Sequence, residues 1–405
     1  MLLMGVAGAL LMVALIVVDA LPAQLEYVII GIMFGMLAIT SILLARRRPW
    51  KRVIGVIFAL IFMLVFGSIA YYLAETYATM NKIAENDTTI NSEMNIGKHV
   101  DPATEPFNLY ITGIDQWETE KGLDLERSDV NMIVTVNPVT KKILLTSIPR
   151  DSYVKLHTAQ QMDKLTHTGV YGVDETINTV SDWLGIDINY YVKMNFTAVR
   201  DIINAMGGIR VYSPVAFDSS LRDYHYDKGW NDLGGREALF FARERHAFEG
   251  QDSVRVENQQ AVMKAIIKKM TSSTTLLTKY GDIMSAAGNN LSTNMSSEEM
   301  QALVRMQVTD LASWDVETQK IEGEYGMGHV ASLSSRNMYS IYITSEESVA
   351  SCLDAIDKIT NPSEEELAAA EKSRNQSFLE NFSNMIREKM EEEKEKRLGE
   401  KDTEE

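Results

Sequence analysis

The sequence predicts an α/β domain carried behind three apolar N-terminal segments. The first 75 residues hold most of the long apolar runs, and a polar stretch follows them. From about residue 105 to residue 360, strand-like and helix-like patterns then alternate without a clear break. Such alternation is typical of one α/β domain, and a length of roughly 250 residues suits a single domain.

The first 75 residues carry the signals of a membrane anchor. Met1–Val18, Tyr27–Ala45 and Val53–Tyr72 are apolar, and each approaches the ~20 residues that a spanning helix needs. Residues 46–52 contain five basic side chains, whereas the first loop has no Lys or Arg. The positive-inside bias therefore predicts a multi-pass protein of the cell membrane, with a cytoplasmic N-terminus and everything after Tyr72 outside the cell. This anchor region covers residues 1–75.

A cleaved signal peptide is the alternative for the first apolar segment. Residues 1–18 have no charged region at their start, and two further apolar segments follow. Both features favour a span over a signal peptide.

The elements outside the membrane can be assigned in order. Residues 76–104 are polar without a sustained period, which predicts an extracellular linker. Residues 107–115 predict a strand, and residues 127–151 predict a β-hairpin, because apolar residues alternate up to a turn at 137–140 and resume beyond it. The predicted helices cover residues 174–184, 196–206, 237–241 and 258–270, and further predicted strands cover residues 209–217 and 338–343.

The tail, residues 361–405, begins with a predicted capping box from Ser363 to Glu366. A short apolar stripe and a Glu/Lys run follow. A solvated helix with a frayed acidic end accounts for this pattern better than a helix that binds a partner.

Composition excludes several classes of function. The formal net charge of -17 argues against a general nucleic-acid binder, which needs clustered Lys and Arg. Cys352 is the only cysteine, so neither an intramolecular disulfide nor a cysteine-based metal site can form. The sequence also lacks a Walker loop, a Gly-x-Ser-x-Gly elbow and a pair of histidines at metal-binding spacing.

Charged residues converge at the open end of the predicted hairpin. Antiparallel pairing about the turn sets residue 127 near residue 151 and residue 129 near residue 149. The side chains brought together are Arg127, Asp129, Arg150 and Asp151, and Asp115 lies just beyond its own strand and can join them. Carboxylates and guanidinium groups together suit a divalent cation beside a phosphate. Salt bridges at the end of a strand pair are the alternative.

A second basic cluster favours the functional interpretation. Arg243, Arg245 and Arg255 lie within thirteen residues of one another, and Asp252 precedes the last of them. In a chain this acidic, closely spaced arginines have no evident role in the overall charge balance. Their clustering favours a local pocket for a polyanion.

These segments together resemble the LytR-CpsA-Psr family of membrane-anchored enzymes from Gram-positive cell envelopes. The resemblance covers about residues 105–360 in the family's motif order, and the three apolar segments resemble the CpsA branch. The residues that carry it are Gly113-Ile114-Asp115, Arg127-Ser128-Asp129, Val136-Asn137-Pro138, Ile148-Pro149-Arg150-Asp151, Asp163-Lys164-Leu165-Thr166-His167, Ala242-Arg243-Glu244-Arg245, and the segment from Asp252 and Arg255 to Asn258-Gln259-Gln260.

The resemblance implies a three-layer α/β/α catalytic domain over residues 105–360 with a central, mainly mixed sheet. It also implies a phosphotransferase activity. A glycan linked to polyprenyl pyrophosphate, such as a capsule or teichoic acid, would be the donor, and a peptidoglycan hydroxyl would be the acceptor.

The resemblance further implies roles for individual residues. Asp115 and Asp129 match the carboxylates associated with Mg²⁺ (or Mn²⁺). The arginines around the pyrophosphate correspond to Arg127, Arg150, Arg243, Arg245 and Arg255. Asp252 matches a further acidic position near the pyrophosphate, and either Asp252 or Asp115 is a candidate general base.

Two other functions stay open at this point. One is a hydrolase that uses the same pocket with water as the acceptor. The other is a non-catalytic envelope regulator or lipid-binding sensor, although the predicted cytoplasmic portion is only a basic loop and the N-terminal end of the chain.

Overall fold

The computed structural model describes residues 2–19, 21–85, 99–114, 128–221, 223–245, 247, 252–333, 337–374, 383 and 387. All structural statements below concern these residues.

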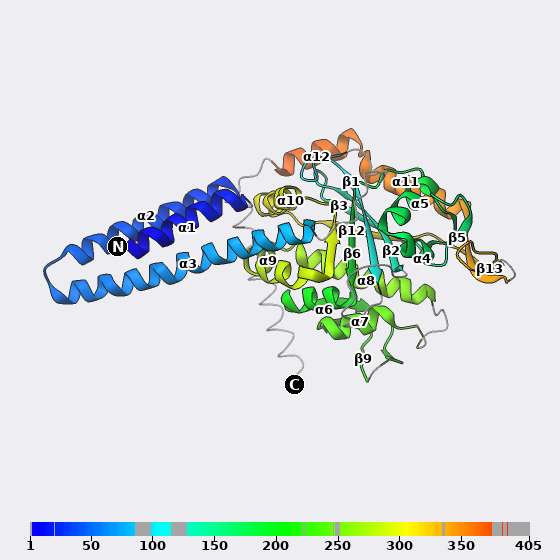
Figure 1. The fold of residues 1–405 in the computed structure, drawn as a ribbon, viewed down its shortest axis with the longest axis horizontal. Coiled ribbons are helices and arrows are strands. Elements are labelled where there is room, and N and C mark those ends of the chain that lie inside the picture. Colours follow the sequence, from blue (N-terminus) through cyan, green and yellow to red (C-terminus); the bar gives the residue numbers. More distant parts are fainter. Residues whose placement is uncertain are drawn as a thin grey trace.

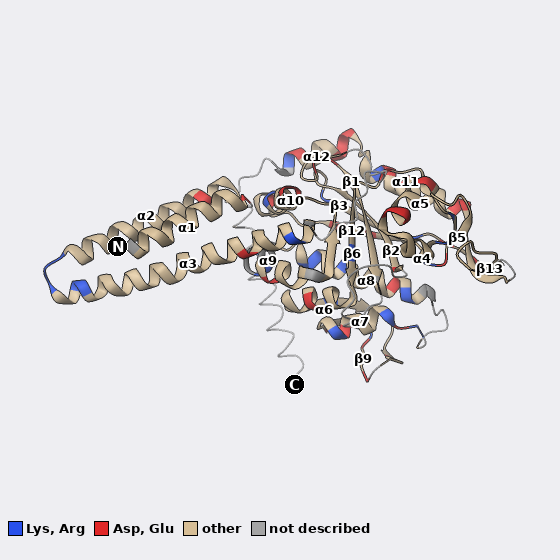
Figure 2. Ribbon diagram, viewed as in Figure 1, with Lys and Arg blue, Asp and Glu red and all other residues tan. Residues whose placement is uncertain are grey.

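A bundle of three apolar helices projects from the mixed α/β domain (Figure 1). The helices are α1 (Leu2–Val18), α2 (Ala23–Ala45) and α3 (Pro49–Glu85). Both α1 and α2 pack on α3, and Phe62 and Phe66 of α3 are buried in the bundle. The basic turn between α2 and α3 lies at the end of the bundle away from the domain (Figure 2).

Two of these helices are long and apolar enough to cross a bilayer, namely α2 and α3. Many of their large apolar side chains, among them Ile32, Phe34 and Leu64, are exposed, as suits a lipid environment. With 17 residues, α1 is a shorter apolar helix of about 25 Å, below the ~30 Å hydrocarbon thickness. Of the three predicted spans, two are thus helices of spanning length and one is a shorter apolar helix, and together they suggest a membrane anchor.

A six-stranded mixed sheet forms the centre of the domain, with the strand order β11-β6-β1-β2-β3-β12. β1 pairs antiparallel with β2 and parallel with β6, and β3 pairs antiparallel with β2 and parallel with β12. The strands are β1 (Phe107–Ile114), β2 (Ser128–Asn137), β3 (Lys142–Ser147), β6 (Tyr190–Asn195), β11 (Leu291–Thr293) and β12 (Asp315–Lys320).

Helices cover both faces of this sheet, as the three-layer prediction requires. Alternate residues of the strands enter two separate cores: Tyr110 and Ile133 pack with α5, whereas Ile111 and Met132 share a core with side chains of α8 and α10. The helices are α4 (Leu165–Thr168), α5 (Val173–Leu184), α6 (Phe196–Ala205), α7 (Gly235–Arg243), α8 (Asp252–Met270), α9 (Ser273–Ala287), α10 (Ser297–Asp310), α11 (Glu346–Thr360) and α12 (Glu364–Arg374), with the 3-10 turns η1 (Gly169–Tyr171) and η2 (Gly288–Asn290).

The described residues also form four small two-stranded sheets outside the central sheet. Of these, the β13–β14 hairpin extends the domain at the end opposite the apolar bundle (Figure 1). The strands are β4 (Tyr153–Lys155) with β5 (Met162–Lys164), β7 (Ile209–Ser213) with β10 (Gly229–Leu233), β8 (Phe217–Asp218) with β9 (His225–Tyr226), and β13 (Gly323–Gly328) with β14 (Tyr339–Thr344).

The segment predicted as a linker, 76–104, begins inside a helix. Thr76, Met80 and Ile83 are buried on one side of α3, and α3 packs against α9 and α10 of the domain. Their spacing of three and four residues is an amphipathic signal that the polar composition of this segment masked. Residues 86–98 of the predicted linker lie outside the described residues.

The predicted hairpin is present as β2 and β3, with a register one residue away from the predicted one. Asn137 pairs with Lys142, and the Asn137 side chain accepts hydrogen bonds from the backbone N–H groups of Val139 and Thr140. Lys141 adopts a φ of 57°, which adds one residue to the loop. The strand pairing itself ends at Met132 and Ser147, and beyond it the Asp129 side chain contacts that of Arg150.

The capping box predicted at residue 363 is present at the start of α12. The Ser363 hydroxyl accepts from the Glu366 N–H, and the Glu366 carboxylate accepts from the Ser363 N–H. An ion pair of 2.5 Å between Lys142 Nζ and Glu366 Oε1 holds this helix against the start of β3. The apolar stripe predicted further along the tail lies almost wholly outside the described residues.

Candidate active site

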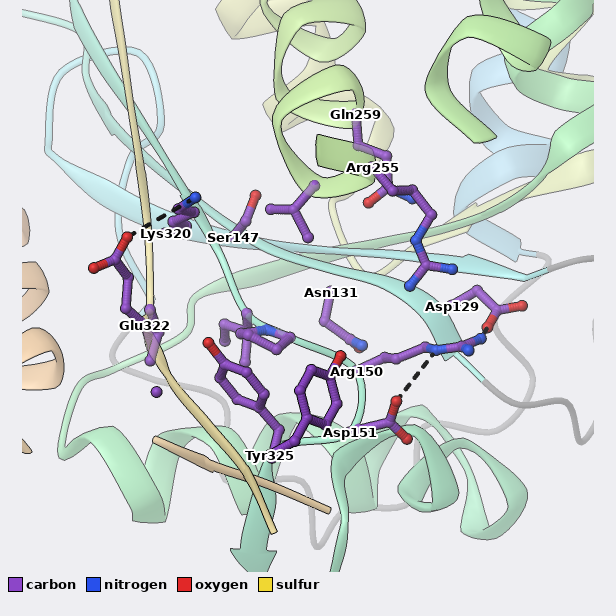
Figure 3. Close-up of a pocket in the computed structure, with 16 residues that line it drawn as sticks. Asp129, Asn131, Ser147, Arg150, Asp151, Arg255, Gln259, Lys320, Glu322 and Tyr325 are labelled. Carbon is purple, nitrogen blue, oxygen red and sulfur yellow. Dashed lines mark hydrogen bonds and ion pairs between the residues drawn. The ribbon is translucent and has the colours of Figure 1, made fainter. Parts of the chain in front are cut away.

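A cavity of about 670 Å³ opens where β2, β3 and β12 approach α8 and the β13–β14 hairpin (Figure 3). Charged and aromatic side chains face each other across it. The residues that line it are Asp129, Asn131, Ser147, Ile148, Pro149, Arg150, Asp151, Arg255, Val256, Gln259, Lys320, Ile321, Glu322, Gly323, Tyr325 and Tyr342.

Arg150 lies between two carboxylates on the floor of this cavity. Its Nη1 pairs with Asp129 Oδ1, and its Nε lies 3.6 Å from Asp151 Oδ2. Lys164 Nζ contacts the other oxygen of Asp151 at 3.0 Å. Because all four side chains are only partly buried, the network is anchored by the protein yet open to a ligand.

The first turns of α8 supply the opposite side of the cavity. Arg255 and Gln259 are four residues apart, so they occupy one face of the helix and both line the cavity. Asp252 is the first residue of α8. The position of its side chain lies outside the described residues, and its predicted role stays a prediction.

The paired arginines 243 and 245 lie apart from the cavity's lining. Arg243 ends α7, and its guanidinium group lies 4.8 Å from the centre of the Phe196 ring. Phe196 directly follows β6, whose last residue, Asn195, pairs with Ile114 at the end of β1. Arg243 is therefore near the carboxyl end of β1, although it is not among the residues that line the cavity.

Glu244, between these arginines, is fully buried, and the sequence interpretation named it in a motif without giving it a role. Its carboxylate accepts hydrogen bonds from the hydroxyls of Ser219 and Ser220 and from the backbone N–H groups of Arg245 and Ala247. Burial alone raises the pKa of this carboxyl, but the hydrogen bonds outweigh burial and lower it. Glu244 thus holds the backbone that presents Arg245.

Two predicted site residues, Asp115 and Arg127, lie outside the described residues. The residues next to them are described: Ile114, which precedes Asp115, pairs with Ser128, which follows Arg127. The end of β1 and the start of β2 therefore lie side by side, next to Asp129.

Asp163 and His167 form a sealed network rather than part of the cavity. His167 Nδ1 is 2.6 Å from Asp163 Oδ1 and 2.8 Å from the Ser332 hydroxyl. The Ser332 N–H donates to Asp163 Oδ2. Both Asp163 and His167 are buried, so their role is structural.

Four charged or aromatic side chains of the cavity, in or beside β12, β13 and β14, were absent from the sequence prediction. They are Lys320, Glu322, Tyr325 and Tyr342. Lys320 pairs in register with Ser147 of β3, and the Tyr342 N–H donates to the Asp151 carbonyl at 2.8 Å. The local sequence around these residues does not predict such long-range contacts. Burial raises the pKa of Tyr342, so its phenol stays protonated.

The donor chemistry of the site is compatible with a hard divalent cation. Mg²⁺ is commonly held by one or two carboxylates together with substrate phosphate oxygens, and Asp129 offers one such carboxylate at the cavity wall. Within the described part of the chain, no group of three or more His, Cys, Asp or Glu side chains has metal-binding geometry. Any such ion would thus depend on Asp129, on Asp115 and on the ligand.

The fold and the site define a mixed α/β domain on an apolar helical anchor, with arginines beside carboxylates in an open cavity. The chain belongs to the LytR_cpsA_psr family, whose family model matches residues 68–358. The membership agrees with the resemblance based on the sequence motifs.

Individual relatives cover most of the domain. The polyisoprenyl-teichoic acid–peptidoglycan teichoic acid transferases TagU of Bacillus licheniformis and Bacillus subtilis are 33% and 34% identical over 262 residues, which is 63% of this chain and 82% of each relative. The crystal structure of B. subtilis TagV has 29% identity and a TM-score of 0.52, covering 64% of this chain and 99% of TagV. TagT bound to LI-WTA has 27% identity and a TM-score of 0.50, covering 65% of this chain and 94% of TagT.

Proposed function

We propose that this protein transfers a glycopolymer, as its glycosyl phosphate, from a polyprenyl-pyrophosphate carrier to a hydroxyl of peptidoglycan. The observation that carries the proposal is the cavity in which Arg150 and Arg255 face Asp129. Family membership and the names of the TagU relatives support a transferase of teichoic-acid type over other uses of such a pocket.

The chemistry asks for little more than positioning and charge neutralisation. The acceptor oxygen would form a bond to the phosphorus that carries the sugar, while the bond from that phosphorus to the bridging oxygen of the pyrophosphate breaks. Polyprenyl phosphate leaves, and the acceptor proton passes to a carboxylate base, for which Asp252 and Asp115 are the candidates. Arg150 and Arg255 would stabilise the negative charge that spreads over the phosphoryl oxygens.

Asp129, together with Asp115, would hold Mg²⁺ or Mn²⁺ beside these arginines. A divalent cation supplies further neutralisation of the pyrophosphate and helps to orient it. The ion pair between Asp129 and Arg150 would keep the carboxylate in place before the donor arrives.

The membrane arrangement follows from the basic turn and the docking of the bundle. Five basic residues within 46–52 favour the cytoplasmic side, and Arg305 of the domain forms an ion pair of 2.6 Å with Asp19, in the turn between α1 and α2. We therefore place the N-terminus inside the cell and the domain outside, where the wall is assembled.

The test uses the full chain in lipid nanodiscs with a synthetic polyprenyl-pyrophosphate-linked disaccharide, Mg²⁺ and soluble uncrosslinked peptidoglycan oligomers. Asp129→Ala and Arg243→Ala are each expected to lower the rate of transfer by about a hundredfold or more, because Asp129 would hold the divalent cation and Arg243 is one of the arginines proposed to act on the pyrophosphate. Thermal unfolding of both variants should stay close to wild type. Equal transfer rates for all three proteins would refute the proposal.

The same assay separates transfer from hydrolysis. A transferase yields a phosphodiester-linked glycan in the presence of the oligomer, whereas a hydrolase releases the same glycosyl phosphate with and without it.

A further inference from the structure

The β13–β14 hairpin forms one wall of the cavity and differs in character from the other walls. Tyr325 and Tyr342 are direct partners across its two strands. Their ring centres are 5.1 Å apart at an interplanar angle of 77°. Tyr325 nevertheless keeps 57% of its surface exposed while it lines the cavity. A large aromatic side chain in this position offers a ring face to whatever occupies the cavity.

The hairpin side presents one carboxylate to the cavity, and this carboxylate is ion-paired. Glu322 Oε1 lies 3.8 Å from Lys320 Nζ, and both side chains line the cavity (Figure 3). Across the cavity, Arg255 and Gln259 lie opposite Tyr325 (Figure 3). Because the Glu322 carboxylate is paired with Lys320, a phosphate would be attracted to the arginine side, and the tyrosine wall suits an uncharged group.

Two hydrogen bonds to backbone carbonyls hold the hairpin in a fixed relation to the rest of the cavity. The Tyr342 N–H donates to the Asp151 carbonyl at 2.8 Å, one residue from Arg150. At the other end of the hairpin, the Tyr153 hydroxyl donates to the His329 carbonyl at 2.7 Å. The hairpin is thus an integral wall of the cavity rather than a detached arm.

Its close packing depends on a glycine. A Cβ at Gly323 would lie 2.1 Å from the Ile343 carbonyl oxygen, so any other residue there would push the strands apart. The hairpin also lies at the end of the domain away from the apolar bundle (Figure 1). A substrate that reaches this wall would arrive from the side opposite the membrane.

We propose that the wall formed by Tyr325, Tyr342 and Glu322 is the subsite for the acceptor glycan, and that it binds an uncharged sugar ring of peptidoglycan. The aliphatic C–H face of a sugar would pack on the Tyr325 ring, and its hydroxyls would donate to the Glu322 carboxylate. This inference rests on the proposed function, because it divides one cavity between a donor phosphate on the arginine side and an acceptor sugar on the tyrosine side.

The test compares Tyr325→Ala with two controls in the full chain. Tyr325→Phe keeps the ring, and Tyr171→Ala removes a tyrosine of equal exposure, 57%, that does not line the cavity. In the transfer assay, Tyr325→Ala is expected to raise the KM for the peptidoglycan oligomer about tenfold while leaving the KM for the polyprenyl-pyrophosphate disaccharide unchanged. Both controls should behave as wild type. An unchanged KM for the oligomer, or a raised KM for the disaccharide alone, would overturn the assignment.

A binding measurement tests the glycan subsite separately from the transferase activity. Isothermal titration of the same oligomer into each protein should give a dissociation constant about tenfold weaker for Tyr325→Ala than for wild type. Loss of binding in Tyr325→Ala without any transfer by wild type would refute the proposed function and keep the glycan subsite. Equal binding by the two proteins, or no binding by wild type, would refute the subsite.

Discussion

Two networks of charged side chains lie close together in the sequence and have opposite relations to solvent. Arg150, Asp129 and Asp151 are partly exposed at the cavity, whereas Asp163 and His167 are sealed in the domain. In the proposed function, an ion network that a ligand can reach would serve recognition, because the incoming phosphate could exchange places with a carboxylate around the arginine. A sealed network contributes to stability instead.

Acid should weaken the fold through Asp163. Burial raises the pKa of this carboxyl, but hydrogen bonds from His167, Ser332 and the Lys164 N–H outweigh burial and bring the pKa below its ordinary value of 3.8. The unfolded chain therefore takes up the proton first, so the stabilisation is present above pH 3.8 and is lost as the pH falls through the lower pKa of the folded state.

Asp163→Asn is expected to lower the free energy of unfolding near neutral pH by about 2 kcal/mol, because it removes the charge from these hydrogen bonds. It should also flatten the loss of stability below about pH 4. Thermal unfolding of the full chain across that range measures both effects. Asp182→Asn, at an exposed ion pair with His157, is the control and should change little. A steep acid loss that persists in Asp163→Asn would contradict this account.

At the scale of elements, the sequence predicts local structure well and distant contacts poorly. The β2–β3 hairpin, α5 ending at Gly185 with its φ of 65°, and α6 were all predictable from periodicity and stop signals. The register was predicted one residue off, because the φ of Lys141 depends on the whole loop rather than on one turn motif.

The aromatic wall could not be predicted for a related reason. Tyr325 and Tyr342 reach the cavity only because β14 bonds to the chain after Arg150, nearly two hundred residues earlier. Nothing in the local pattern of β13 or β14 specifies that partner. The side proposed to bind phosphate, by contrast, consists of arginines and carboxylates, and the chemistry of these residue types makes them recognisable in the sequence.

The docking of α3 on the domain is an element that can be tested. Ile83 is 1% exposed in the core shared with α9, so Ile83→Ala is expected to lower the free energy of unfolding by about 3 kcal/mol. Val170→Ala, at an exposed position, should change it by less than about 0.5 kcal/mol. Thermal unfolding of the full chain in detergent compares them. Equal stability of the two variants would show that α3 does not pack on the domain in solution.

At the scale of the molecule, the proposed arrangement in the membrane predicts which parts of the chain are accessible. Single cysteines would be placed at Lys51, in the basic turn, and at Glu324, on the hairpin, with Cys352 replaced by serine. A membrane-impermeant maleimide added to intact cells is expected to label the cysteine at 324 and not the one at 51, which should react only after lysis. The reverse pattern would invert the proposed topology.

The helix α3 runs without interruption from the anchor into the domain, so the length of this helix fixes the rotation of the domain relative to the anchor. Its 37 residues span about 55 Å, against ~30 Å for the hydrocarbon layer, so about 25 Å of helix belongs to the domain side. Adding one residue near Tyr72 would raise the domain by about 1.5 Å and also turn it by about 100° relative to α1 and α2, which would break the contact between Arg305 and Asp19. The height of the cavity above the bilayer therefore cannot be changed by a residue or two without turning the domain. Only insertions or deletions close to a whole number of helical turns in α3 would keep the cavity facing the same way.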